Sequence, residues 1–173
     1  MSVQEAARRY FDAWNARDAD AVLDSLAANG TYTDPTTPGP LSGDDLRAHI
    51  IGLWQAFPDL AFEIVSQAET GGGRLAAEWL MRGTNTGSFR GLPPTGKPVV
   101  LAGADFISTD GSKIETVTGY FDGGAVPRQL GLQIIVQPYQ VGPFGFGYSV
   151  QVQSGRRSAP GAMAITTLNA IGD

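Results

Sequence analysis

The sequence predicts an α+β protein, in which N-terminal helices pack on one face of a curved, mostly antiparallel sheet. Helical spacing of apolar residues dominates the first third of the chain, and strand-like segments follow from about residue 60 to residue 122. Strands and helices do not alternate in the way that indicates parallel βαβ units, and no segment repeats. These observations favour segregated helices and strands over a doubly wound fold.

The clearest expected helix spans residues 3–16. Its apolar residues fall at i, i+3 and i+4 spacing, which produces one buried stripe, and Ser2 with Glu5 fits a capping box. A second short helix is expected after Asp18. Both helices therefore present one apolar face to a common core.

A strand over residues 30–34 and a third helix come next. The strand leads into a proline-rich loop, and the helix begins after Ser42 and ends at Pro58, because proline cannot continue a helix. The remaining strands are expected at residues 60–70, 74–87, 98–110 and 112–122. Three successive glycines, at 71–73, indicate a hairpin between the first two.

The last expected strand, 112–122, carries the main candidate for chemistry. A period of two places alternate residues on one inward face: Ile114, Thr116, Thr118, Tyr120 and Asp122. Gly123 and Gly124 then break the strand, and a short helical turn follows. A carboxylate is thus expected at the last inward position of a rigid strand.

Composition excludes several classes of function. The 173-residue chain is 42% hydrophobic and 17% charged, with a formal net charge of −5, which argues against a nucleic-acid partner. It has no cysteine, so disulfides and thiolate metal sites are excluded. No apolar run has the length of a signal peptide or a membrane span, and we expect a cytoplasmic protein that does not bind membranes.

The single histidine, His49, narrows the possible chemistry further. A Ser-His-Asp triad is hard to build around it, and a multi-histidine metal site is excluded. We interpret His49 as a residue of the helix surface or of the core. An enzyme built from this sequence is expected to use carboxylates, hydroxyls and amides.

Five segments occur in the order and spacing of a known family: AWNARDADAV, YTDPTTPGPLSG, AFPDL, GTNTGSFRGLPPTGKPV and IETVTGYFDGGAVPRQLGL. With these segments, residues 3–132 resemble the SnoaL-like polyketide cyclases of the nuclear-transport-factor-2-like superfamily. The resemblance implies a cone-shaped α+β barrel of helices and a bent sheet around one deep pocket. Because this fold carries several activities, the resemblance is stronger evidence for fold than for function.

The resemblance also implies a reaction. Cyclases of this family close a ring by intramolecular aldol condensation, without metal or organic cofactor, and use a carboxylate as acid/base. The family's aspartate lies shortly before a Gln-Leu-Gly sequence, a position that Asp122 occupies here. A carboxylate in an apolar pocket has a raised pKa and becomes a better base near neutral pH. The alternative is that Asp122 only caps the following turn.

Two further residues are candidates for catalysis. Asn85 either donates a hydrogen bond to a developing enolate oxygen or is a turn residue. Asp105, in the middle of a strand, either faces the pocket beside Asp122 or pairs with an arginine such as Arg82. Facing the pocket in its protonated form, Asp105 would serve as a hydrogen-bond donor to an enolate.

The remaining candidates are expected to line the substrate pocket. They are Trp14, Tyr32, Asp34, Trp79, Met81, Phe106, Thr118 and Tyr120. The alternative for the aromatic and apolar members is a place in the core, and for Asp34 the start of a turn.

The sequence is compatible with three functions. The first is a cofactor-free cyclase or isomerase acting on a hydrophobic, polyketide-like ketone or ester. The second is a small-molecule-binding or accessory module without chemistry of its own. The third is an epoxide hydrolase-like activity, which needs two carboxylates bridged by an arginine, with Asp105, Asp122 and Arg82 as the parts.

Residues 133–173 differ in composition from the preceding domain, 1–132, and contain two alternating runs that predict strands. Forty residues cannot form an independent core. This extension is therefore expected to pack on the domain, on a partner subunit or on a following domain. The resemblance also implies a homodimer formed through the exposed face of the sheet.

Overall fold

The computed structural model describes residues 2–141, 145–154 and 165–170. The chain divides into two compact units, the first ending at Gly123 and the second beginning at Gly124. The division lies ahead of the boundary expected after residue 132. The predicted runs of the extension that fall in residues 155–164 lie outside the described residues.

Three helices precede most of the sheet in the first unit, as the apolar spacing predicts. They are α1 (Val3–Ala16), α2 (Ala19–Ser25) and α3 (Gly43–Ala56). Ser2 caps α1 by accepting a hydrogen bond from the backbone N–H of Glu5, at 3.1 Å, and Asp18 caps α2 in the same way through the N–H of Ala21, at 2.9 Å. None of the helices in the described residues has the length and apolar character needed to span a bilayer.

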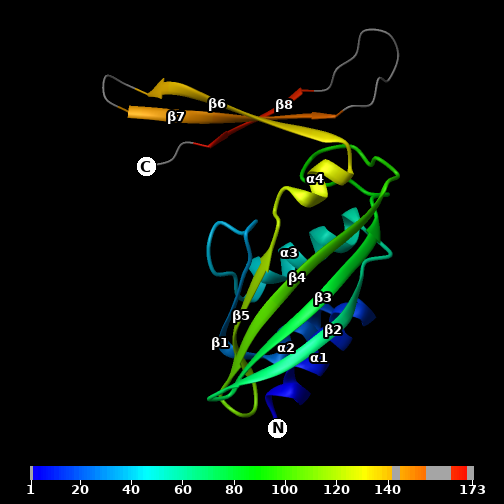
Figure 1. Ribbon diagram of the computed structural model, residues 1–173, viewed down its shortest axis with the longest axis vertical. Helices are drawn as coiled ribbons and strands as arrows, with labels where there is room; N and C mark the ends of the chain where they lie inside the picture. The colour runs from blue at the N-terminus through cyan, green and yellow to red at the C-terminus, as the bar shows by residue number, and fades with distance from the viewer. Residues whose placement is uncertain (1, 142–144, 155–164, 171–173) are drawn as a thin grey trace. The chain divides into compact units, whose positions relative to one another are not determined.

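The first unit contains a five-stranded mixed sheet with the strand order β1-β5-β4-β3-β2. Its strands are β1 (Leu26–Thr33), β2 (Ala61–Gly71), β3 (Arg74–Thr84), β4 (Pro98–Thr109) and β5 (Ile114–Phe121). β1 runs parallel to β5 and the other neighbours are antiparallel, as Figure 1 shows together with the helices packed on the sheet. The predicted α+β class is confirmed, with a sheet that stays open at β1 and β2.

Burial alternates along the central strands and defines an inner face toward the helices. On β3 the odd-numbered residues from Leu75 to Met81 are buried, and on β4 Val99, Leu101 and Ile107 follow the same parity. Glycines allow close packing on this face, since the indole ring of Trp79 lies where any side chain at Gly103 would start. Odd-numbered residues of β3 and β4 therefore face the core.

The face predicted for β5 is wrong. Ile114 is buried as expected, but Thr116 and Tyr120 are exposed, whereas Val117 and Gly119 are buried. The pairing between β4 and β5 shifts register between Ser108 and Thr109, and such a shift reverses the parity of a strand. The expected inward face of this strand is thus its outer face beyond residue 115.

The second unit contains α4 (Ala125–Gln129), which coincides with the expected helical turn, and a three-stranded antiparallel sheet. The sheet has the order β6-β7-β8, from β6 (Leu132–Val141), β7 (Gly145–Ser154) and β8 (Ile165–Ala170). The packing of the extension on the domain, on a partner subunit or on a following domain remains a prediction.

Candidate functional site

Asp105 is the most deeply placed carboxylate of the inner face. It lies in the middle of β4, is 4% exposed, and accepts a hydrogen bond from Trp79 Nε1 at 3.0 Å. Burial raises the pKa of Asp105 to about 6, against the lowering effect of the Trp79 hydrogen bond and with a further raising effect of the Asp34 charge. Near neutral pH this carboxyl group can therefore either accept or donate a proton.

Gly119 makes room for two carboxylates on this face. It is the register partner of Asp105 on β5, and a Cβ at Gly119 would lie 3.1 Å from Asp105 Oδ1 and 3.5 Å from the Cβ of Asp34. A side chain here would crowd both acids. The parallel pairing of β1 with β5 thus brings Asp34, one residue past the end of β1, to the neighbourhood of Asp105.

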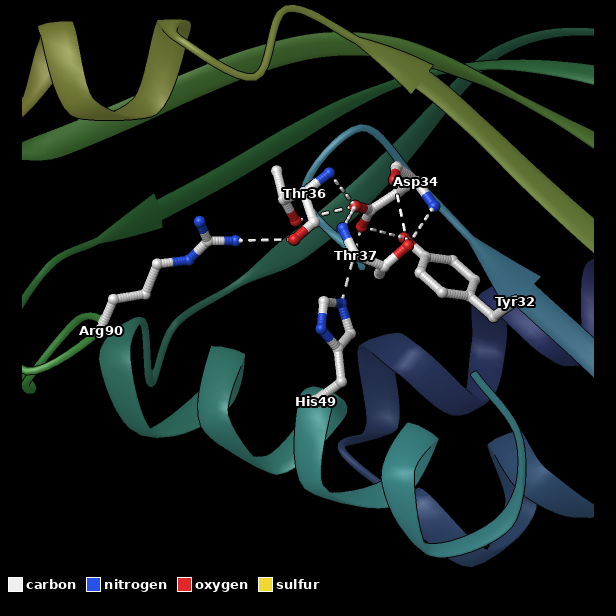
Figure 2. Close-up of polar contacts among 6 residues, drawn as sticks. All are labelled: Tyr32, Asp34, Thr36, Thr37, His49 and Arg90. Atoms are coloured by element: carbon white, nitrogen blue, oxygen red, sulfur yellow. Dashed lines mark hydrogen bonds and ion pairs between the residues drawn. The ribbon is translucent and has the colours of Figure 1, made fainter. Parts of the chain in front are cut away.

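Asp34 is 7% exposed and its carboxylate is fixed by a tight turn. Its Oδ1 accepts hydrogen bonds from the backbone N–H and hydroxyl of Thr36, at 2.6 and 2.7 Å, and from the N–H of Thr37 at 3.0 Å. Its Oδ2 accepts one from the Tyr32 hydroxyl at 2.8 Å. The predicted turn-starting role of Asp34 and its place on the inner side of the fold are both present in this arrangement (Figure 2).

His49 contacts the second oxygen of the same carboxylate. It projects from α3 with a side chain that is 16% exposed, and its Nε2 lies 3.6 Å from Asp34 Oδ2. Burial lowers the pKa of His49, the charge of Asp34 raises it, and the charge of Arg90 lowers it again. His49 was not expected in the site, although it lies between Leu46 and Ile50, two buried residues of α3.

Two tyrosines of the core stay protonated beside these acids. Tyr10, 2% exposed, and Tyr32, 8% exposed, both have a pKa raised above the usual value, chiefly by burial and also by the negative charges of Asp34 and Asp105. Tyr10 is one of the buried residues of α1. Its proximity to two carboxylates arises from the packing of α1 on the sheet.

Aromatic side chains surround the inner face. Trp14, 2% exposed, packs edge-on against Trp54 and Phe62, and Phe62 packs edge-on against Trp79. Met81 is 6% exposed on the same face of β3 as Trp79. The predicted pocket residues Trp14, Trp79 and Met81 therefore lie in the core, and Trp79 contacts Asp105 directly.

Three predicted pocket residues lie on the other side of the sheet. Phe106 and Tyr120 are 42% and 59% exposed and pack edge-to-face against each other, and Thr118 shares their parity as the register partner of Phe106. Adjacent strand residues point to opposite faces, so Asp105 and Phe106 cannot line the same space. Placing Phe106, Thr118 and Tyr120 inward was wrong for this reason.

Asn85 is fully buried, and its side chain is used within the protein. Its Nδ2 donates to the carbonyls of Ala56, at 3.2 Å, and Gly87, at 2.9 Å, while its Oδ1 accepts from the backbone N–H and hydroxyl of Thr95. Both amide hydrogens are therefore donated already. The geometry favours the turn-residue interpretation over a donor to an enolate.

Asp122 follows the last residue of β5 and is exposed. It lies next to the division between the two units, which falls after Gly123. Its assignment as the family's acid/base aspartate remains a prediction.

The arrangement does not support the arginine-bridged carboxylates of an epoxide hydrolase-like site. The side chain of Arg82 is 55% exposed, lies opposite in parity to Trp79 and Met81, and approaches Glu63 at 3.7 Å. It cannot bridge to the buried Asp105. Among the described residues, no group of three or more metal-binding side chains is arranged to hold an ion.

A surface hollow of about 480 Å³ lies elsewhere, between α1 and β2. Its lining includes Glu5, Arg8, Asp12 and Gln67, and none of the predicted site residues. This polar surface depression is unrelated to the carboxylates of the inner face.

Comparisons with known proteins agree with this fold. AclR from Streptomyces galilaeus, described as a proposed hydroxylase, is 21% identical, with a TM-score of 0.66 over 75% of this chain and 95% of its own. IdmH from Streptomyces antibioticus, a proposed polyketide cyclase, is 21% identical, with a TM-score of 0.66 over 76% and 99%. A protein from Catenulispora acidiphila with a ketosteroid isomerase-like fold is 20% identical, with a TM-score of 0.64 over 75% and 94%.

No curated protein matches the chain. A family model described as SnoaL-like polyketide cyclase matches residues 4–130, which include both carboxylates of the inner face, His49 and Asp122. The protein belongs to the SnoaL-like polyketide cyclase family.

Proposed function

We propose that the protein is a cofactor-free cyclase or isomerase that transfers protons on a polycyclic ketone or ester, in a ring closure of the intramolecular aldol type. The observation that carries this proposal is the buried carboxyl group of Asp105, which lies near Asp34 on the face of the sheet that the helices cover. The family membership and the neighbouring IdmH, a proposed polyketide cyclase, support the substrate class.

The reaction requires two proton transfers. A base removes a proton from a carbon next to a carbonyl, and the C–H electron pair passes into an enolate, which attacks a second carbonyl of the same molecule. The resulting alkoxide then takes up a proton, so that no atom is lost or gained. A group with a pKa of about 6, as burial gives Asp105, is suited to such transfers, which are each worth about 10²–10⁴ in rate.

Asp105 and Asp122 are the competing positions for the principal carboxylate. The family resemblance implies Asp122, whereas burial and the raised pKa favour Asp105. Replacing each by asparagine retains size and removes the ability to take up a proton, so the two variants separate the assignments.

The test is hydrogen–deuterium exchange at the α-carbon of 2-tetralone in D₂O, followed by proton NMR. This bicyclic ketone requires no ring closure and reports proton removal alone. We expect the wild-type protein to accelerate exchange above buffer, Asp105→Asn to lower the rate by about 10²-fold or more, and the exposed control Asp44→Asn to match wild type. A wild-type protein that leaves exchange at the buffer rate would refute the proposed chemistry.

The alternative is a binding module of the same fold. Two observations favour it. Both amide hydrogens of Asn85 are donated to backbone carbonyls of the protein, and Asp122 is exposed. Fewer of the predicted catalytic groups are therefore available at the inner face. A binding module would take up the ketone, as seen by quenching of tryptophan fluorescence, without exchanging its protons.

A homodimer is also part of the proposal. The outer face of the sheet carries four exposed apolar side chains, with exposed fractions of 42–59%: Val65, Val100, Phe106 and Tyr120. A second copy of the chain would remove such a surface from water.

A further inference from the structure

We propose that His49 is a second catalytic residue of this site, accepting a proton through Nδ1, and that Asp34 is the residue that positions it. This assignment rests on the proposed function and divides its two proton transfers between two groups. It uses a histidine that the pattern of the sequence assigned to the helix surface or the core.

The carboxylate of Asp34 is held in one orientation. Three hydrogen bonds from Thr36 and Thr37 fix Oδ1, at 2.6 to 3.0 Å, and the Tyr32 hydroxyl fixes Oδ2 from one side. The pairing of Tyr32 with Leu41 closes the loop that carries these residues. Oδ2 therefore cannot turn away from the imidazole that faces it.

This orientation selects one tautomer of His49. Nε2 is buried and hydrogen-bonds to no group among the described residues, and Asp34 Oδ2, at 3.6 Å, is the acceptor in front of it. A buried N–H without an acceptor is costly, and contacts of this kind shorten when a ligand excludes water. We therefore place the proton of the neutral ring on Nε2, which leaves the lone pair on Nδ1.

The free side of the ring faces away from Asp34. Figure 2 shows the other ring nitrogen, Nδ1, on the side of the ring where Arg90 lies. The cluster thus extends from buried Asp105, through Asp34 and His49, to an exposed arginine. A ligand approaching from the Arg90 side meets Nδ1 first.

Burial is the main reason that the His49 ring is neutral near pH 7. Asp34 and the Tyr32 phenol face it from the end of β1, and Arg90 faces it from the loop that follows β3. Burial and Arg90 together outweigh Asp34, so the pKa is lowered and the ring is a base at neutral pH.

Arg90 is placed to stabilise the negative charge that proton removal creates. Its Nη2 donates to the Thr36 carbonyl at 3.4 Å, its guanidinium lies 5.5 Å from the centre of the Phe89 ring, and the described residues offer it no carboxylate partner. Its backbone φ is 51°, in the left-handed region that residues with a side chain rarely adopt. A cation beside Nδ1 would attract an enolate oxygen.

In the proposed step, Nδ1 takes the proton from the carbon next to the ketone. The ring becomes an imidazolium stabilised by Asp34, and the C–H electron pair becomes the enolate, whose oxygen is stabilised by Arg90. In D₂O the imidazolium exchanges its proton with solvent and returns a deuteron to carbon. Protonated Asp105 donates a hydrogen bond to the enolate oxygen in this step, so the exchange rate declines when Asp105 ionises, and in ring closure it supplies the proton that the new alkoxide takes up.

The first part of the test is the tautomer of His49. Because the chain has a single histidine, protein labelled with ¹⁵N-histidine gives one imidazole spectrum. At pH 8 we expect the wild-type ring to carry its proton on Nε2. Asp34→Asn keeps the acceptor that Thr36 and Thr37 use but presents an amide donor to Nε2, so the proton is expected to move to Nδ1. A wild-type proton on Nδ1, or a tautomer unchanged in Asp34→Asn, overturns the positioning role.

The second part is the pH profile of 2-tetralone exchange in the wild-type protein, His49→Gln and Asp34→Asn. We expect His49→Gln to exchange about 10²-fold more slowly and to lose the rise of the rate with pH that deprotonation of His49 gives, while keeping the decline that Asp105 gives. Asp34→Asn should lower the rate without a matching change in KM, and circular dichroism should show all variants folded.

The outcomes separate this inference from the proposed function. If wild type and His49→Gln exchange equally fast, the role of His49 is overturned and the proposed function stands. If His49→Gln is slow but keeps the full pH profile of wild type, His49 acts through structure alone and its catalytic role is overturned. If wild type does not exchange the ketone, the proposed function fails, and this inference fails with it.

Discussion

Asp105 and Asp34 approach each other at Gly119, where a Cβ would lie 3.1 Å from the Oδ1 of the first and 3.5 Å from the Cβ of the second. They come from β4 and from the end of β1, two strands that both pair with β5. One glycine of β5 thus allows two acids to share the inner face, and the charge of Asp34 contributes to the raised pKa of Asp105.

Gly119→Ala should destabilise the protein by roughly 1–3 kcal/mol, because the added methyl group presses on Asp105 where neighbouring strands cannot easily separate. Urea unfolding followed by circular dichroism measures this. The matched control is Gly52→Ala in α3, where a Cβ meets nothing within 4 Å and alanine favours the helix by about 1 kcal/mol. Equal stability of wild type and Gly119→Ala would contradict the crowding at this position.

Asp105→Asn should stabilise the protein at pH 8. The folded-state pKa of Asp105, about 6, lies above the unfolded value near 3.9, so the native state binds the proton more tightly. The contribution of Asp105 to the free energy of unfolding of the wild-type protein is therefore greatest below pH 4. This contribution, about 1–3 kcal/mol, is lost as the pH rises through 6. Asparagine keeps the acceptor for Trp79 and carries no charge to bury.

Unfolding curves of both proteins at pH 5 and pH 8 test this difference. The advantage of Asp105→Asn over wild type should be larger at pH 8. An advantage that is the same at both values would mean that Asp105 is not a buried acid with a raised pKa.

Trp79→Phe should raise the pKa of Asp105 further. The indole N–H donates to Asp105 Oδ1 at 3.0 Å and favours the ionised carboxylate, and phenylalanine cannot do so. Carboxyl-carbon NMR titration gives the pKa directly, with Asp105→Asn used to assign the signal. The control is Trp54→Phe, which removes an indole that donates to no described group. It should leave the pKa of Asp105 unchanged.

Asn85→Ala should cost roughly 2–4 kcal/mol in stability, because it leaves buried partners at Ala56, Gly87 and Thr95 without their hydrogen bonds. Thermal and urea unfolding measure the loss. Asn29→Ala, at an exposed position of β1, should change stability by less than about 0.5 kcal/mol. A stable Asn85→Ala that loses only ketone exchange would instead support the catalytic interpretation.

Replacing both Phe106 and Tyr120 by serine should favour the monomer. These rings are exposed on the outer face of the sheet and contact each other, so they offer an apolar patch to a second copy. Sedimentation velocity over a range of concentrations gives the mass, with Glu69→Gln on the exposed edge strand as control. A wild-type protein that is monomeric at all concentrations would remove the dimer from the proposal.

Local pattern in the sequence determined the helices, the strand positions and the fold class. Apolar spacing and capping residues such as Ser2 and Asp18 act within a few residues, so α1 and α2 could be predicted from neighbours alone. The alternation along β3 and β4 likewise allowed the sequence to predict that Asp105 either faces the pocket or pairs with an arginine.

Tertiary structure decided which side chains share the site. The register shift between β4 and β5 turned Tyr120 outward, since one extra residue in a pairing reverses every side chain beyond it, and the single-strand pattern carries no sign of it. Asp34 approaches Asp105 because β1 pairs in parallel with β5. His49 approaches Asp34 because of the way in which α3 packs in the fold. Contacts between residues distant in sequence follow from packing of whole elements, which the local pattern of any one of them does not contain.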